Sequence, residues 1–257
     1  GNSARDAHNA AGGAIYNRVT PNPESVLESS EAEYSEAAFN ISGNFIGNSA
    51  VALSGADPVS LALYALSTTG MGGAIANNAS IGNITGNFIG NYASVSAVNG
   101  IAKGGAIYNS SNGTAIIGDI TGNFLSNYVQ YLSKYSKLTL GGAVYSNANL
   151  SFTAKGKQRF FSGNYTNDQT RGKNYNALFV QSVTDLASAP VIAFDTTGGG
   201  AWVVKDSIEG GLLYYGSAEI DYGNQYNLAF KGNGKLNADG LTDQYISINN
   251  DIINAGE

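Results

Sequence analysis

The sequence contains no cysteine, a single histidine and only four prolines. Without cysteine, disulfide bonds, thiolate metal ligands and thiol catalysis are excluded. Because His8 is the only histidine, a zinc site would have to rely on carboxylates, and no nucleophile-elbow pattern accompanies any serine. Calcium loops of the EF-hand or Gly-Gly-x-Gly-x-Asp type are also missing. We therefore predict no metal site, no cofactor and no catalytic residue.

Charge is scarce as well. Charged residues make up 12% of the chain, about half the usual share of a soluble protein, and the net charge is −6. Between Ala37 and Ala102 the only charged side chain is Asp57, which disfavours a helical surface of Glu-Lys pairs. The nearest approach to a basic cluster, between residues 155 and 159, alternates along the chain in the manner of a strand's solvent face. Nucleic acid is therefore excluded as a partner, because phosphate binding needs a concentrated basic face.

Long hydrophobic runs are also missing, although 43% of the residues are apolar and can build a continuous core. No run reaches the length of about 18 residues that a membrane-spanning helix needs. The chain opens at Gly1 without a signal-peptide pattern. We therefore expect a piece of a longer protein.

What the sequence does contain is glycine, at 34 positions, and a phrase that returns four times. Its first part, Gly-Gly-Ala followed by a β-branched residue, falls at Gly12–Ile15, Gly72–Ile75, Gly104–Ile107 and Gly141–Val144. Its second part, Phe-x-x-Asn, falls at Phe45–Asn48, Phe88–Asn91, Phe124–Asn127 and Phe161–Asn164. A paired motif that recurs in a fixed order indicates an internally repeated architecture.

The spacing of the phrase gives the size of the repeat. Phe88 to Phe124 spans 36 residues and Phe124 to Phe161 spans 37, and the glycine pair divides each unit into halves of 16–20 residues. Such a half holds three strands of about four residues with short turns. Gly-Asn, Ser-Gly and Asn-Gly pairs every few residues exclude helical repeats. We predict an all-β parallel β-helix (β-solenoid) in which each half is one rung.

Each element of the phrase has a structural reason. We expect the glycine pairs to let rungs approach closely, some of them at positive φ. The phenylalanines are expected to stack inside, and the asparagines to form an amide ladder between turns. The structural motif residues are Gly12, Gly13, Phe45, Asn48, Gly72, Gly73, Phe88, Asn91, Gly104, Gly105, Phe124, Asn127, Gly141, Gly142, Phe161 and Asn164.

Two intervals in the first third exceed the regular spacing, from Gly12 to Phe45 and from Phe45 to Gly72. Insertions in a repeat protein map to surface loops, so we predict loops at about 18–40 and 51–70. The phrase is lost after Asn176, but short β runs persist. We therefore predict a repeat β-helix over 1–175, and over 176–257 either its continuation, which we favour, or a β cap.

Four alternating pairs of Gly-Gly-Ala-(Ile/Val) and Phe-x-x-Asn resemble the passenger regions of polymorphic outer-membrane proteins and related autotransporters, over about residues 10–166. The resemblance implies a right-handed parallel β-helix, to which the motif spacing adds loop insertions in its first third. It also implies export through an outer-membrane translocator absent from this chain, and display on a Gram-negative cell surface as an adhesin and virulence factor.

Parallel β-helices also include polysaccharide lyases and glycosidases, which need paired carboxylates. Asp119 lies inside the repeat region, where Asn83 stands in the preceding copy, which favours a turn role over catalysis. No consistent basic partner for a lyase accompanies the acids. The acidic candidates of the tail are Asp195, Asp206, Glu209, Glu219 and Asp221.

Tyrosines are the better binding candidates, because exposed rings anchor sugars or proteins at low entropic cost. The ligand-binding candidates are Tyr128, Tyr131, Tyr135, Tyr214, Tyr215 and Tyr222. The hypothesis from sequence is a non-catalytic, surface-exposed adhesin-like fragment that binds a host or environmental glycan or protein through its loops or tyrosine-rich edge. A carbohydrate-active enzyme and a purely structural stalk remain the alternatives.

Overall fold

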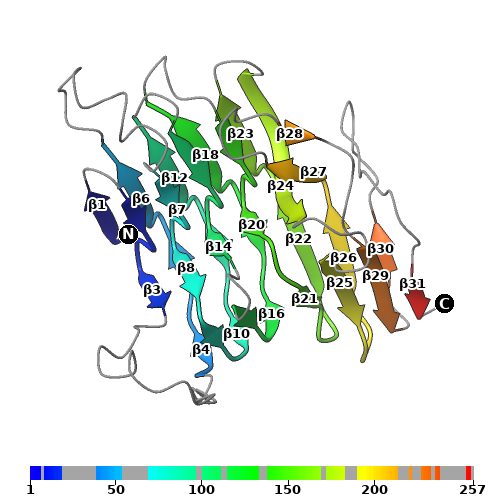
Figure 1. Cartoon of the computed structure of the whole chain (residues 1–257). Coiled ribbons are helices and arrows are strands. Elements are labelled where there is room, and N and C mark those ends of the chain that lie inside the picture. Colours follow the sequence, from blue (N-terminus) through cyan, green and yellow to red (C-terminus); the bar gives the residue numbers. More distant parts are fainter. Residues whose placement is uncertain are drawn as a thin grey trace, which may run out of the picture.

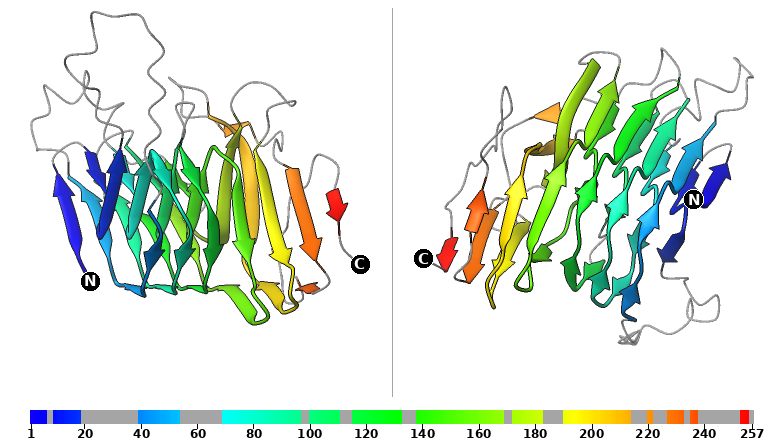
Figure 2. Two further views of the ribbon diagram at one scale, coloured as in Figure 1. Left: turned by 90° about the horizontal axis from the view of Figure 1, so that it is seen from below. Right: turned by 180° about the vertical axis from the view of Figure 1, so that it is seen from behind.

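The computed structural model describes residues 1–6, 9–18, 39–53, 69–96, 100–110, 115–132, 138–168, 172–182, 190–213, 220–221, 227–232, 235–237 and 253–255. The chain is an all-β parallel β-helix, and the predicted fold class is confirmed (Figure 1). Successive coils stack along one axis, so the N-terminus lies at one end and the C-terminus at the other (Figure 2). Within these ranges there is no helix, and hence none able to cross a membrane.

The strands form stacked parallel sheets, which we call A to F. Sheet A contains β1 (Ser3–Asp6), β6 (Ser49–Ala52), β12 (Tyr92–Val95), β18 (Tyr128–Tyr131) and β23 (Tyr165–Asp168). Sheet B contains β2 (Asn9–Ala11), β7 (Thr69–Met71), β13 (Ile101–Lys103) and β19 (Leu138–Leu140). Sheet C contains β3 (Ile15–Arg18), β8 (Ile75–Asn78), β14 (Ile107–Asn109), β20 (Val144–Ser146), β24 (Gly172–Ser182), β27 (Ser207–Leu213) and β28 (Ile220–Asp221).

Sheets D and E complete the coils, and a short sheet F is added in two of them. Sheet D contains β4 (Ile41–Ser42), β10 (Ile84–Thr85), β16 (Asp119–Thr121), β21 (Leu150–Thr153), β25 (Val191–Thr196), β29 (Asn227–Gly232) and β31 (Ile253–Ala255). Sheet E contains β5 (Phe45–Ile46), β11 (Phe88–Ile89), β17 (Phe124–Leu125), β22 (Gln158–Ser162), β26 (Ala201–Val204) and β30 (Lys235–Asn237). Among the described strands, sheet F contains β9 (Ser80–Ile81) and β15 (Ile116–Ile117).

One coil is a whole repeat, so the prediction that each half-unit is one rung was wrong. Phe88 pairs in register with Phe124, and Ile75 with Ile107, one full repeat further along the chain. The chain therefore passes through sheets A, B, C, D and E before it returns to its starting face. The half-unit does not close a coil, because the glycine pair only links a strand of sheet B to a strand of sheet C. The chain must still pass through sheets C, D and E before the coil is complete.

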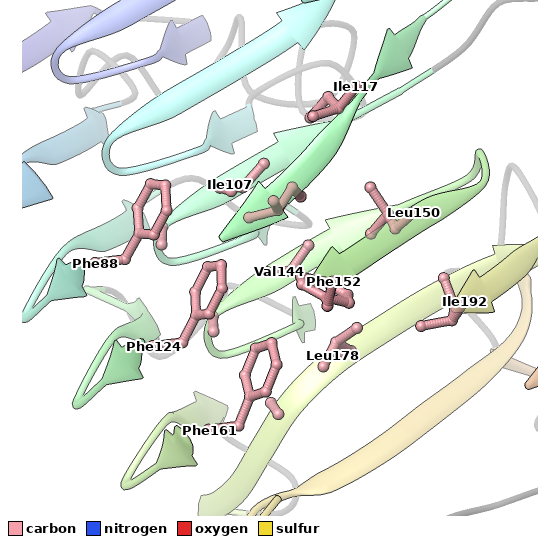
Figure 3. Packing of buried hydrophobic residues seen from close by; sticks show 14 of the residues in the cluster. Phe88, Ile107, Ile117, Phe124, Val144, Leu150, Phe152, Phe161, Leu178 and Ile192 are labelled. Atoms are coloured by element: carbon pink, nitrogen blue, oxygen red, sulfur yellow. The ribbon is translucent and has the colours of Figure 1, made fainter. Parts of the chain in front are cut away.

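The cross-section has two lobes with different cores. The large lobe, between sheets C, F, D and E, is filled by isoleucine, valine, leucine and aromatic side chains. In it Phe45, Phe88, Phe124 and Phe161 stack with centroid spacings of 4.8, 4.7 and 4.6 Å, and Figure 3 shows the last three in line. Burial of each ring contributes about 2–3 kcal/mol. The narrow lobe, between sheets A and B, contains little more than alanine and valine.

The two parts of the repeated phrase meet at the junction of the lobes. The first glycine of each pair has positive φ, for example +64° at Gly104, which a glycine adopts without strain. The second glycine lies against the strand that follows the Phe-x-x-Asn motif. A Cβ on Gly105 would stand 2.6 Å from the Tyr128 oxygen and 2.1 Å from the Gly142 oxygen of the next coil. The glycines are thus needed both within a coil and between coils.

Asparagine ladders connect the turns of successive coils. In the inner ladder, Asn48, Asn91 and Asn127 each donate their side-chain amide to the side-chain oxygen of the next asparagine, at 2.9 Å each time. Each of these oxygens also accepts the backbone N–H of the preceding asparagine, and Asn127 donates to the Phe88 carbonyl. The side chains are buried, so the ladder satisfies polar groups that water does not reach.

The coil changes shape after the fourth repeat. β23 turns back into β24 as an antiparallel hairpin, and the far part of β24 then pairs in parallel with β20 of sheet C. Among the described strands sheet B ends at β19, while sheets D and E continue through β25, β26, β29 and β30. The described strands of the tail therefore continue the large lobe, and none of them belongs to sheet B. Residues 177–181, 191–194 and 201–204 lie in strands β24, β25 and β26, so short β runs do persist after Asn176.

The insertions predicted at about 18–40 and 51–70 fall largely on residues that the structure does not describe. The first follows β3 and precedes β4, and the second follows β6 and precedes β7. Residues 19–38 and 54–68 lie outside the described ranges.

Candidate ligand-binding surface

A row of four tyrosines crosses the outer face of sheet A. Tyr92, Tyr128 and Tyr165 are in register on neighbouring strands, and Tyr175 of β24 pairs with Tyr165. The residue that follows each tyrosine on its strand, such as Val129, points into the narrow core. Because side chains alternate along a strand, the tyrosines point outward. The first three rings are half-buried, whereas Tyr175 is 41% exposed. We call these four residues the tyrosine row.

The rings of Tyr92, Tyr128 and Tyr165 stack in parallel. The centroids of Tyr92 and Tyr128 are 5.0 Å apart and those of Tyr128 and Tyr165 are 5.1 Å apart, with planes within 5°. Lys173 Nζ lies 4.3 Å from the Tyr165 centroid and 4.8 Å from that of Tyr175, which places a cation at the C-terminal end of the row. The row thus combines stacked phenol rings with one positive charge.

This stacking determines which atoms a ligand can reach. Both faces of Tyr128 are covered, one by Tyr92 and the other by Tyr165, so a sugar ring cannot stack on it. A ligand can therefore contact only the outer edges and hydroxyl groups of the stacked rings. These groups repeat once per coil along the row. The arrangement suits an elongated ligand with repeated hydrogen-bonding groups better than a single ring.

Partial burial, together with the neighbouring phenols Tyr92 and Tyr165, raises the pKa of Tyr128 above its ordinary value of 10.0. The folded chain therefore keeps this proton at pH values where the unfolded chain loses it. The stability that Tyr128 contributes is present below pH 10.0 and is lost as the pH rises through the raised pKa.

We predict that the phenolate absorbance of folded wild-type protein, minus that of Tyr128→Phe, rises with a midpoint above pH 10.0. In denaturant the midpoint of the same difference titration should return to the ordinary tyrosine pKa, because burial and the neighbouring rings are lost. A difference titration in the folded state with a midpoint at or below pH 10.0 would contradict the stacked arrangement.

Of the tyrosines proposed from sequence, only Tyr128 and Tyr131 are in the described ranges, and they lie on opposite faces. Tyr131 is in register with the core residue Val95, so alternation turns it away from the row. The remaining candidates, outside the described residues, are Tyr135, Tyr214, Tyr215 and Tyr222. Sequence reasoning missed Tyr92 and Tyr165. The available signal was that tyrosine directly follows the asparagine in three of the four Phe-x-x-Asn motifs.

The acidic candidates have structural contacts. Asp119 stands in an outer ladder, where its backbone N–H donates to the Asn83 side chain and its carboxylate accepts from Ser151 Oγ at 3.0 Å. Asp195 accepts the backbone N–H of Thr197 at 2.7 Å, and Glu209 accepts from the Asn174 side chain. Glu219 and the side chain of Asp221 lie outside the described part of the chain.

Asp206 ends the inner asparagine ladder. Its carboxylate is 2% exposed and accepts three hydrogen bonds, from the Gly163 and Asn164 backbone N–H groups and from the Asn164 side chain. Burial raises the pKa of Asp206, and these hydrogen bonds oppose the rise. Among the described residues, no three His, Cys, Asp or Glu side chains gather in a way that holds a metal ion.

Comparisons with protein-family models, curated proteins and solved structures return no match.

Proposed function

We propose that this chain is a non-catalytic binding scaffold whose ligand surface is the tyrosine row, and that it serves as an adhesin-like passenger displayed on a bacterial cell surface. The observation behind the proposal is the row itself: four tyrosines in register, half-buried or exposed, with Lys173 at one end. The ligand we propose is an elongated host or environmental glycan, or an extended segment of a host protein.

The distribution of polar groups supports a binding role over catalysis. A glycosidase needs two carboxyl groups about 5–10 Å apart across the scissile bond. The carboxylates of Asp119, Asp195 and Asp206 instead accept hydrogen bonds from Ser151 Oγ, the Thr197 backbone N–H and the Gly163 backbone N–H, respectively. The resemblance of the repeated phrase to autotransporter passengers supports the surface location and the anchoring by a separate outer-membrane translocator.

The test is a glycan array together with host-cell binding, comparing wild type with the triple variant Tyr92→Phe, Tyr128→Phe, Tyr165→Phe. The variant keeps the stacked rings and removes only the hydroxyl groups, so the fold is retained. We expect affinity to fall at least tenfold, because each hydrogen bond to a ligand contributes about 0.5–1.5 kcal/mol.

Tyr16→Phe is the matched control, because Tyr16 is 48% exposed but belongs to β3 of sheet C, away from the row. Its binding should equal that of wild type. Unchanged binding by the triple variant would show that the ligand binds elsewhere. Turnover of any bound glycan would show that the chain is an enzyme and not a binding scaffold.

A further inference from the structure

A second cluster fills the outer corner between sheets B and C, on the opposite side of sheet B from sheet A. It consists of the outward-facing residues of both sheets: Ala76, Tyr108, Leu138, Leu140, Tyr145 and Phe179, with Ala11, Met71 and Ile101 packed against them. The Tyr108 and Tyr145 rings stack at 5.3 Å, and Phe179 follows at 6.1 Å. This outer corner is apolar, buried and distinct from the tyrosine row.

One lysine is buried in the outer corner. Lys103 of β13 is only 8% exposed, and its Nζ lies 3.1 Å from the Tyr145 hydroxyl oxygen and 4.4 Å from the Tyr145 ring centroid. Burial lowers the pKa of Lys103 to about 8, and no carboxylate among the described residues offsets this effect. A substantial fraction of the amine is therefore neutral, and nucleophilic, near pH 8.

A carboxamide lies on the other side of the same hydroxyl group. The Tyr145 hydroxyl donates a hydrogen bond to Gln181 Oε1, and Gln181 is buried at 7% exposure. A hydrogen bond to the carbonyl oxygen polarises the amide carbon and stabilises the negative charge that develops on that oxygen during attack. An amine, a carbonyl group and a hydroxyl between them are thus held together away from water.

We propose that Lys103 and Gln181 form an intramolecular isopeptide bond, with Tyr145 as the residue that activates the amide. The Lys103 Nζ lone pair attacks Gln181 Cδ, and the carbonyl electron pair moves onto Oε1. When the carbonyl re-forms, the Cδ–Nε2 bond breaks, and Nε2 takes the proton released by Nζ through the Tyr145 hydroxyl and leaves as ammonia. One C–N bond forms and one breaks, and no oxidant or reductant is needed.

The positions of the two residues give the bond a structural role. Lys103 belongs to sheet B, whereas Gln181 belongs to β24, the strand that crosses from sheet A to sheet C. The bond would join the narrow lobe to the first coil beyond it. In a chain without cysteine, it would supply the covalent cross-link that disulfides provide elsewhere.

The test is mass spectrometry of the complete folded chain after incubation near pH 8. We expect the intact mass to fall by one ammonia relative to the sequence, trypsin to stop cutting after Lys103, and a branched peptide to join the segments containing Lys103 and Gln181. Fragment mapping is essential, because Asn99-Gly100, Asn112-Gly113 and Asn233-Gly234 also lose ammonia if they cyclise to succinimides.

Three variants make the result specific. Lys103→Arg should abolish the branched peptide, Tyr145→Phe should slow its formation at least tenfold while keeping the ring stack, and Lys157→Arg at an exposed position should leave it unchanged. Circular dichroism checks that each variant folds. Wild-type protein that keeps the mass of its sequence and is cut after Lys103, or that shows an ammonia loss only at other sites, would overturn the proposal.

Discussion

Gly105→Ala is expected to cost at least about 3 kcal/mol in the free energy of unfolding, because its methyl group would overlap backbone atoms on two sides. The added Cβ would stand 2.1 Å from the Gly142 oxygen and within 2.7 Å of the Tyr128 nitrogen and oxygen. Backbone in a sheet cannot move aside as a flexible side chain does. The substitution would therefore separate neighbouring coils and push sheet A away from the junction of the lobes.

Gly90→Ala is the matched control for this prediction. Gly90 has φ of +61° but no atom within 4 Å of an added Cβ, so only backbone strain of about 1–2 kcal/mol is expected. Urea denaturation followed by circular dichroism measures both variants. If Gly105→Ala proved no more destabilising than Gly90→Ala, the close approach of the two lobes at this glycine would be wrong.

Asn127→Asp is expected to cost a similar amount, about 3 kcal/mol or more at neutral pH, although the two side chains have the same shape. Asn127 donates to the Phe88 carbonyl and to Asn164 Oδ1, and a carboxylate would place a negative oxygen against both acceptors. The substituted side chain would be buried without a counter-charge. Its cost should shrink in acid, where a protonated carboxyl group restores one donor.

Asn123→Asp provides the comparison, since Asn123 occupies the same kind of ladder in a part-buried position. It donates to Asn87 Oδ1 at 2.9 Å, and its own oxygen accepts the Phe160 backbone N–H. Water reaches this ladder, so a cost of about 1 kcal/mol is expected. Urea midpoints at neutral and acidic pH test both variants, and equal midpoints would show that burial of the inner ladder contributes nothing.

The sequence predicted the stacking of like residues well, because the repeat period is visible in it. Parallel pairing places Phe88 beside Phe124, and the same period places Asn91 beside Asn127. It could not predict how the chain closes each coil. The second glycine of each pair lies against the backbone of sheet A, a contact between distant parts of the chain that the spacing of the motifs does not reveal.

The candidate sites were harder to predict for related reasons. Tyr128 was found from its type, but its stacked partners follow only from the register of three coils. Lys103 gave no signal, since a lysine ending a short β run is normally read as solvent-exposed. It is buried because sheets B and C enclose an outer corner, which is a property of the whole coil.

The inner asparagine ladder behaves electrically as a small macrodipole. Its side-chain amides all donate toward the C-terminal coils, so their dipoles add and the positive end lies where Asn164 meets Asp206. The buried carboxylate complements that end, as an acidic residue does at a helix N-terminus. The outer ladder of Asn44, Asn87 and Asn123 donates in the opposite direction, so its side-chain dipoles oppose those of the inner ladder.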